Sequence, residues 1–175
     1  MPTTMIHLPL LIEADDLLAL MPHDKLLIVD TSSAVNYDAG HIAGAVHVPA
    51  AQLQSGIKPA AGQIPSLQNL SELCQSIGLT PDKHVVVYDD EGGGWAGRFI
   101  WLLDSIGHTR YSYLNGGYLA WEAEKRPLTQ ASPVVSRSHH NVRMNHNHTA
   151  AIEEVLEAIT ESSTVIWDAR SPQEY

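Results

Sequence analysis

Two continuous apolar runs constrain the fold more than any other feature of the sequence. Leu26-Leu27-Ile28-Val29-Asp30 ends in a carboxylate, and His84-Val85-Val86-Val87-Tyr88 is rich in β-branched residues. Runs of this kind are typical of strands that are buried on both faces of a parallel sheet. Weaker patterns predict further strands at 46–48 and 111–114, and a short edge strand at 10–12.

Helical patterns alternate with these strands. Apolar residues recur at helical spacing between Ser66 and Ile77, where Ser66 can cap the N-terminus and Gly78 can end the helix. Two more helices are expected at about 95–106 and 118–124. Strands that alternate with helices predict an α/β fold with a mostly parallel central sheet flanked by helices.

Composition excludes several classes of protein. Hydrophobic residues make up 44% of the chain, enough for a core, and the formal net charge of −10 argues against a nucleic-acid partner. No apolar stretch approaches the roughly 20 residues that span a bilayer, so no membrane association is expected. The N-terminus is a poor signal peptide and the single cysteine, Cys74, cannot form an internal disulfide. Cytoplasm is the default location.

An internal repeat relates the beginning of the chain to its end. Residues 14–37 align without a gap with residues 152–175, at an offset of 138. Both copies begin with an acidic amphipathic pattern and continue with a strand pattern that ends in aspartate, at Asp30 and Asp168. Ser33 aligns with Ser171, and Tyr37 with Tyr175. Unrelated helix–strand pairs would share the apolar pattern but would not usually keep these polar residues in register, so we interpret the match as a duplication and expect a strand at 164–168.

Three ordered motifs carry a family resemblance. The strand ending at Asp30 is followed by Tyr37 and by Gly40-His41-Ile42-Ala43-Gly44-Ala45; Tyr88 is followed by Asp89-Asp90-Glu91-Gly92-Gly93-Gly94-Trp95-Ala96-Gly97-Arg98; and Leu114-Asn115-Gly116-Gly117 precedes Ala120-Trp121. This order resembles the rhodanese family, and most of all its bacterial two-domain thiosulfate sulfurtransferases. Asp168-Ala169-Arg170-Ser171-Pro172-Gln173-Glu174-Tyr175 is similar to the opening of a second domain.

The resemblance implies a domain organisation. Residues 8–125 would form a rhodanese-like domain, 126–149 a linker rich in proline and histidine, and 150–175 the start of a second, incomplete rhodanese-like domain. The expected partner is the remaining C-terminal rhodanese domain, in the same polypeptide or in a separate chain. The expected substrate is a small anionic sulfur donor such as thiosulfate.

The resemblance also implies a chemistry that this chain lacks. In the family, a cysteine opens the loop after the central strand and carries a persulfide, because loop N–H groups and a helix N-terminus lower its thiol pKa. Here Asp89 occupies that position, and a carboxylate cannot carry sulfane sulfur. We therefore expect no catalytic residue in this chain and no sulfur transfer from thiosulfate to cyanide by the chain alone. The alternative is an inactive rhodanese-like binding or scaffold module, whereas a related phosphatase would also need the loop cysteine.

Other candidate residues have simpler explanations. Arg98 is the most plausible anion contact, although a structural role is equally possible, and Trp95 is a candidate interdomain contact because the helix at 95–106 is apolar all round. That helix predicts an apolar patch beside residues 89–98, covered by polypeptide beyond Tyr175. Asp89 is expected to accept N–H groups of residues 92–94 or of the next helix. The remaining candidates have no expected function, and no metal or cofactor is expected. We interpret Cys74 as a buried, inert thiol, Asp89-Asp90-Glu91 as an acidic loop and His41 as a loop residue. Arg170 and Glu174 are expected to form an ion pair, and any zinc binding by His139, His140, His146 and His148 would be by chance.

Overall fold

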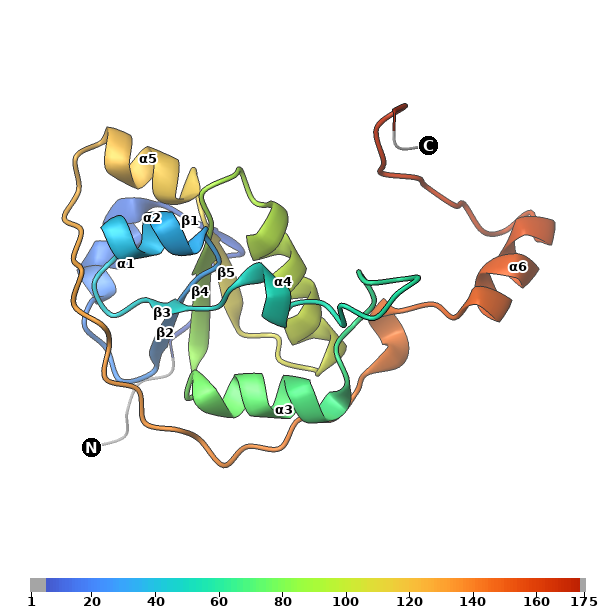
Figure 1. Ribbon diagram of the computed structural model, residues 1–175, viewed down its shortest axis with the longest axis horizontal. Coiled ribbons are helices and arrows are strands. Elements are labelled where there is room, and N and C mark those ends of the chain that lie inside the picture. The colour runs from blue at the N-terminus through green and yellow to red at the C-terminus, as the bar shows by residue number, and fades with distance from the viewer. Residues whose placement is uncertain (1–5, 174–175) are drawn as a thin grey trace. The chain divides into compact units, whose positions relative to one another are not determined.

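The central sheet has five parallel strands. The computed structural model describes residues 6–173 and divides into a first unit ending at Asn145 and a second beginning at His146. In the first unit the strands lie in the order β1-β5-β4-β2-β3, and every paired strand is parallel (Figure 1). Their bounds are β1 Leu11–Ile12, β2 Leu26–Asp30, β3 Val46–His47, β4 His84–Tyr88 and β5 Tyr111–Leu114. The predicted α/β class and all five predicted strands of this unit are confirmed.

Helices cover both faces of this sheet (Figure 1). They are α1 Ala14–Leu20, α2 Ala34–Ala39, α3 Leu67–Ser76, α4 Gly94–Ser105 and α5 Gly117–Ala123, with a short 3₁₀ turn η1 at Ala50–Gln52. Alternate side chains of β4 point to opposite faces, so Val85 and Val87 pack with α3 and α4, and Val86 packs with α1 and α5. Both faces of the central strand are thus buried, as its continuous apolar sequence predicts.

Helix α3 shows why the local sequence predicts its bounds well. The Ser66 hydroxyl accepts a hydrogen bond from the Asn69 N–H at 3.2 Å, and this bond caps the N-terminus. Leu70, Leu73 and Cys74 face the core, and Gly78 follows the helix with a φ of +71°.

Residues 126–145, here called the strap, run along the first unit. Thr129 pairs with His41, the Ser138 N–H donates to the Gln75 carbonyl at 3.0 Å, and Val142 is buried in the core cluster of α3 and α4. The strap passes so close to Gly78 that a Cβ there would lie 2.8 Å from the Ser136 carbonyl oxygen. The stretch 126–149, whose composition indicates a linker, is therefore docked on the first unit as far as Asn145.

The second unit contains η2 at His146–His148 and α6 at Ile152–Thr160. The prediction of a strand at 164–168 is wrong, because these residues form no strand in the structure. A strand exists only where its N–H and C=O groups pair with a neighbour, and among residues 6–173 none pairs with this segment. Glu174 and Tyr175 lie outside the described residues, so the predicted pair of Arg170 with Glu174 and the match of Tyr175 to Tyr37 lie there too. Across residues 6–173, no helix is long and apolar enough to cross a bilayer.

Local conformations nevertheless repeat at the offset of 138. Asp16 accepts the Glu13 N–H at the start of α1, and Glu154 accepts the Ala151 N–H at the start of α6, at 3.3 and 2.6 Å. The carboxylate of Asp30 accepts the N–H two residues later at 2.8 Å, and Asp168 does the same at 3.0 Å. The repeated sequence therefore forms the same helix start and the same turn in both places.

Candidate functional site

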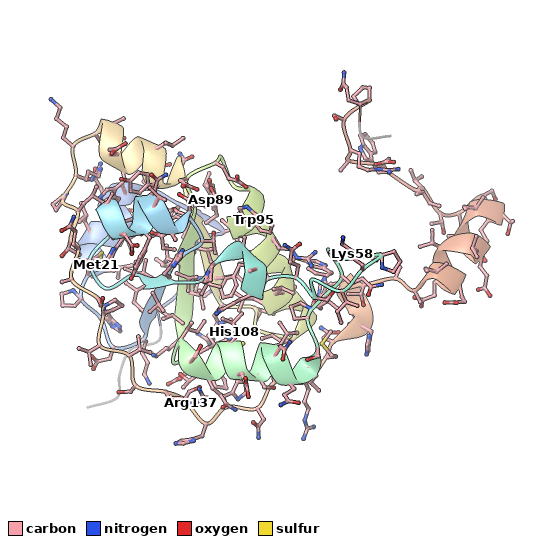
Figure 2. The ribbon with its side chains drawn as sticks, viewed as in Figure 1. Met21, Lys58, Asp89, Trp95, His108 and Arg137 are labelled. Carbon is pink, nitrogen blue, oxygen red and sulfur yellow. The ribbon has the colours of Figure 1, made fainter. Side chains whose placement is uncertain are left out.

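The carboxyl ends of the parallel strands place three loops at one edge of the sheet. β2 ends at Asp30, β4 at Tyr88 and β5 at Leu114, and the segments that follow meet there. In open α/β sheets this edge is where ligands bind. Asp89, the first residue after β4, lies at its centre, and Figure 2 shows Asp89 and Trp95 at the same end of α4.

Asp89 is a buried carboxylate held by backbone N–H groups. The residue is only 1% exposed to solvent. Oδ1 accepts the Gly93 N–H at 2.8 Å and the Glu91 N–H at 3.3 Å, and Oδ2 accepts the Ala96 N–H at 3.0 Å in the first turn of α4. The expected hydrogen bonds from residues 92–94 and from the next helix are therefore present. The carboxylate occupies the position where a helix N-terminus favours an anion.

Glycines let the backbone close tightly around this carboxylate. Gly93 has a φ of +103°, a conformation that favours glycine, and it presents its N–H to Asp89. Gly117 has a φ of +56°, and a Cβ there would lie 2.6 Å from the Asp89 carbonyl oxygen. That carbonyl accepts the Tyr118 N–H at 2.8 Å, so the start of α5 is fastened to the loop after β4. Burial and the negative charge of Asp89 also raise the pKa of the Tyr113 hydroxyl.

Asp90 joins the loop after β4 to the start of α2. Its Oδ2 accepts the Ser33 N–H at 3.1 Å, the Ser33 hydroxyl at 2.8 Å and the Asn36 amide at 2.6 Å. Burial opposes ionisation, but the hydrogen bonds from Ser33 and Asn36 outweigh it and lower the pKa of Asp90. The carboxylates of Asp89 and Asp90 thus both accept hydrogen bonds from donors within the fold. In the sequence, Ser33 stands out only through the repeat and Asn36 does not stand out at all, because nothing there pairs these residues with Asp90.

Arg98 is held by backbone carbonyls of the segment before α3. Its Nε donates to the Leu53 carbonyl at 2.9 Å and its guanidinium donates to the Gly62 carbonyl at 2.7 Å. The guanidinium also lies over the Trp101 ring, 4.5 Å from the centroid. These contacts favour a structural role for Arg98 over the contact with an anion that the sequence also allows.

Helix α4 has its apolar sides covered by the chain itself. Trp95, Ile100 and Trp101 are half-buried and pack against the core cluster that also contains Leu53 and Val142. The segment bound by Arg98 and the strap therefore cover much of this helix, and the expected contact of Trp95 with polypeptide beyond Tyr175 stays a prediction. At the carboxyl edge the exposed large apolar side chains are instead Val35 and Leu119.

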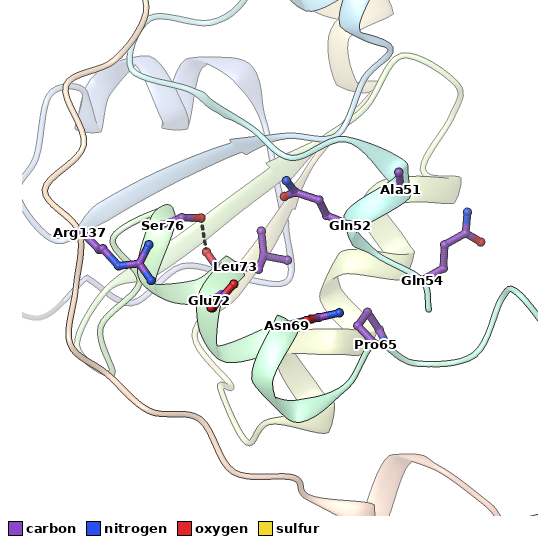
Figure 3. A pocket seen from close by; sticks show the side chains of 9 residues that line it. All are labelled: Ala51, Gln52, Gln54, Pro65, Asn69, Glu72, Leu73, Ser76 and Arg137. Carbon is purple, nitrogen blue, oxygen red and sulfur yellow. Dashed lines mark hydrogen bonds between the residues drawn. The ribbon is translucent and has the colours of Figure 1, made fainter. Parts of the chain in front are cut away.

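Among residues 6–173 the remaining candidates from the sequence supply neither a thiolate nor a metal-binding cluster. Cys74 is buried on α3, and burial raises the pKa of its thiol to about 12, so it stays protonated. The acidic loop 89–91 and the four histidines of 139–148 belong to no set of three or more residues placed to hold a metal ion. A cavity of about 370 Å³ lies between η1 and α3, and no residue of the loop after β4 lines it (Figure 3).

Comparisons with known proteins agree on one family. The family model described as "Rhodanese-like domain" matches residues 13–124, more than half of the chain. A thiosulfate sulfurtransferase of Azotobacter vinelandii is 47% identical over 168 residues, covering 96% of this chain and 62% of that protein. A thiosulfate sulfurtransferase of Pseudomonas aeruginosa is 42% identical with the same coverage. The chain thus spans less than two thirds of the length of these relatives. The crystal structure of SseA from Escherichia coli, described as a 3-mercaptopyruvate sulfotransferase, superposes with a TM-score of 0.86 at 25% identity, covering 94% of this chain and 67% of that one.

Proposed function

Because the chain belongs to the rhodanese family, we propose that it is the non-catalytic first domain of a thiosulfate:cyanide-type sulfurtransferase. One observation carries the proposal: a carboxylate, Asp89, opens the loop after β4 and already accepts its inward N–H groups. A thiol at such a position could hold a sulfur atom as a persulfide anion, whereas a carboxylate cannot.

The reaction itself then belongs to a second domain. The sulfane sulfur of thiosulfate passes to a cysteine thiolate, sulfite leaves, and an acceptor such as cyanide takes the sulfur from the persulfide. The thiolate must be stabilised by loop N–H groups, and the buried thiol of Cys74 has no such environment. We place the catalytic cysteine in a C-terminal rhodanese domain beyond Tyr175, in the same polypeptide or in a separate chain, and we expect both to work in the cytoplasm.

Two observations support a second domain. The helix start and the aspartate turn of the first domain recur at residues 151–154 and 168–170 at the offset of 138. The chain also spans only 62% of the two bacterial thiosulfate sulfurtransferases that it matches. Domain bounds of 8–125, 126–149 and 150–175 follow from this proposal, with the strap lying on the first domain.

The test combines the sequence of the gene with a measurement of sulfur transfer by its products. The gene is sequenced past the codon for Tyr175, and a second strand, cysteine loop and helix are expected there. Thiocyanate formation from thiosulfate and cyanide is then measured for residues 1–175 and for the longer product. Only the longer product should be active. Thiocyanate formation by residues 1–175 that disappears in Cys74→Ser would show that the proposed division of roles is wrong.

The same hydrogen bonds favour a second candidate, an inactive rhodanese-like binding or scaffold module. Asp89 fills the anion position of its own loop, so the N–H groups of Glu91, Gly93 and Ala96 are not free to bind a substrate. A stop codon directly after Tyr175 would favour this candidate, and the absence of transfer activity from the natural gene product would support it.

A further inference from the structure

A second polar site lies at the amino-terminal edge of the sheet, at the end of β4 opposite to Asp89. A cavity of about 350 Å³ lies there between the end of α4 and the strap, and Figure 2 marks its position with His108. Its polar lining residues are His108, Thr109, Arg110, His140, Asn141 and Arg143. None of the described residues that line it is an aspartate or a glutamate.

The charge of this region differs in sign from that of the chain. The whole chain has a formal net charge of −10. Residues 125–152, which include the strap, nevertheless contain four of the ten Lys and Arg residues and no Asp or Glu. The sequence therefore concentrates positive charge on the segment that forms one wall of the cavity.

Among the described residues, the two arginines that line the cavity differ from the others in the contacts of their guanidiniums. Arg98 donates to two carbonyls, Arg126 pairs with Asp15 and Glu124, Arg137 donates to Gln75, and Arg170 pairs with Asp168. Within residues 6–173, the guanidiniums of Arg110 and Arg143 make no hydrogen bond or ion pair, and both line this cavity.

The pKa of His108 reflects the same positive charge. Burial lowers the pKa of its imidazole, the hydrogen bond to the Arg110 carbonyl opposes this, and the positive charges of His140 and Arg110 lower it again. Two carbonyls at the end of α4 are already occupied by N–H groups of the turn that follows. Gly107 N–H donates to the Asp104 carbonyl and His108 N–H to the Leu103 carbonyl, each at 2.9 Å.

We propose that this cavity binds a small divalent oxyanion between Arg110 and Arg143. A guanidinium presents two parallel N–H groups that match a pair of oxyanion oxygens, and two of them balance a double negative charge. Thr109 and Asn141 also line the cavity, and the hydroxyl of the first and the amide of the second can donate to the remaining oxygens. Sulfate, thiosulfate and phosphate share this chemistry. The site does not depend on the proposed sulfur transfer, because it lies at the other end of β4.

The experiment is an NMR titration of the whole 175-residue chain. Sodium sulfate, sodium thiosulfate and sodium phosphate are added separately, with sodium chloride at matched ionic strength as the reference. Saturable shifts are expected for the amides of Thr109, Arg110, Asn141 and Arg143. Arg110→Gln and Arg143→Gln should each weaken the affinity about tenfold or more, because each removes one charge-assisted pair of hydrogen bonds.

Arg137→Gln is the matched control. It removes the same charge from the same strap, but Arg137 donates to Gln75 and lines the separate cavity beside Glu72 (Figures 2 and 3). The Arg137→Gln variant should bind the oxyanion with the same affinity as the unaltered chain. Saturation by thiosulfate and sulfate alone would identify a site for sulfur oxyanions, and saturation by phosphate alone a phosphate site. Shifts that sodium chloride reproduces, or an equal loss in Arg137→Gln and Arg143→Gln, would overturn the proposal. Because Arg143 is exposed, Arg143→Gln keeps the test valid if Arg110→Gln fails to fold.

Discussion

Asp89 places a fixed negative charge where the loop after β4 gathers its backbone N–H groups. Gly93 and Ala96 donate to its two oxygens at 2.8 and 3.0 Å, and the residue is almost completely buried. Without a carboxylate these donors would be buried and unsatisfied. The side chain therefore stabilises the loop at the position where a catalytic member of the family would need a thiol.

Replacing this carboxylate should destabilise the fold. We expect Asp89→Ala to lower the free energy of unfolding by about 2–4 kcal/mol, since each buried donor left without a partner costs roughly 1–3 kcal/mol. Urea denaturation followed by circular dichroism measures the change. Glu91→Ala is the control, because Glu91 is exposed in the same loop and its N–H, which Asp89 accepts, is unchanged. Equal stability of the two variants would mean that the loop N–H groups do not need Asp89.

The contacts that the sequence predicts join residues close together in the chain, whereas the contacts that it does not predict join distant residues. Asp89 and its donors lie within seven residues of one another, so loop chemistry predicts their contact. Arg98 and Leu53 are 45 residues apart, and Asp90 and Ser33 are 57 residues apart. Only the folded sheet brings such residues together. Arg98 therefore remained undecided from the sequence, and the oxyanion cavity, built from 79–81, 106–110 and 140–143, could not be foreseen.

Among the elements, the strap shows most clearly what composition cannot predict. Continuous apolar runs predict the strands and periodic apolar patterns predict the helices, whereas residues 126–145 have neither and contain two prolines. Their attachment depends on single contacts: Thr129 with His41, Ser138 with Gln75, and the close passage of Ser136 over Gly78. Gly78, in the turn that follows α3, thus leaves room for a segment that is far away in the sequence.

A methyl group at Gly78 should loosen the strap. Gly78→Ala places a Cβ 2.8 Å from the Ser136 carbonyl oxygen at a φ of +71°. We expect a loss of about 2–4 kcal/mol, of which roughly 1–2 kcal/mol is the cost of the left-handed backbone. Gly107→Ala is the control, because its φ is +75° and a Cβ there meets open space. Amide hydrogen exchange at Ser138 should become faster in Gly78→Ala and stay slow in Gly107→Ala; equal exchange in both variants would contradict the contact.

His84 links three separate parts of the first unit. It begins β4, its Nε2 lies 2.8 Å from the Ser112 hydroxyl in β5, and that hydroxyl donates to the Pro9 carbonyl. Since the hydroxyl proton is used on Pro9, His84 must donate to Ser112 through Nε2. Burial and the positive charges of His108, Arg110 and His7 lower the pKa of His84 from 6.5 to about 4, so its imidazole is neutral at pH 7.

This neutral histidine should make the fold sensitive to mild acid. The unfolded chain takes up the proton more readily than the folded one, so the stabilisation is complete above the unfolded pKa of 6.5 and is lost as the pH falls toward 4. Between about pH 8 and pH 5 the loss should be about 2 kcal/mol. His84→Gln keeps an N–H donor for Ser112 but cannot titrate, so its urea stability should fall by about 2 kcal/mol less over this range. Parallel pH profiles for the two proteins would rule out His84 as the acid-sensitive group.

The second unit gives the last prediction, because its helix is amphipathic but exposed. α6 leaves Ile152, Leu156 and Ile159 more than half exposed, although the equivalent helix α1 buries Leu17 completely. A helix of nine residues is marginal in water without such packing. In residues 1–175 we therefore expect fast amide exchange throughout α6 and cleavage by a glutamate-specific protease at Glu153, Glu154, Glu157 or Glu161 before any site in 13–124. In the proposed two-domain protein both should be slowed at least tenfold, because Val155 would be buried as Leu17 is. Exchange in the strap should be equally slow in both proteins and serves as the internal control. Slow exchange of α6 in residues 1–175 would mean that this helix needs no second domain to cover it.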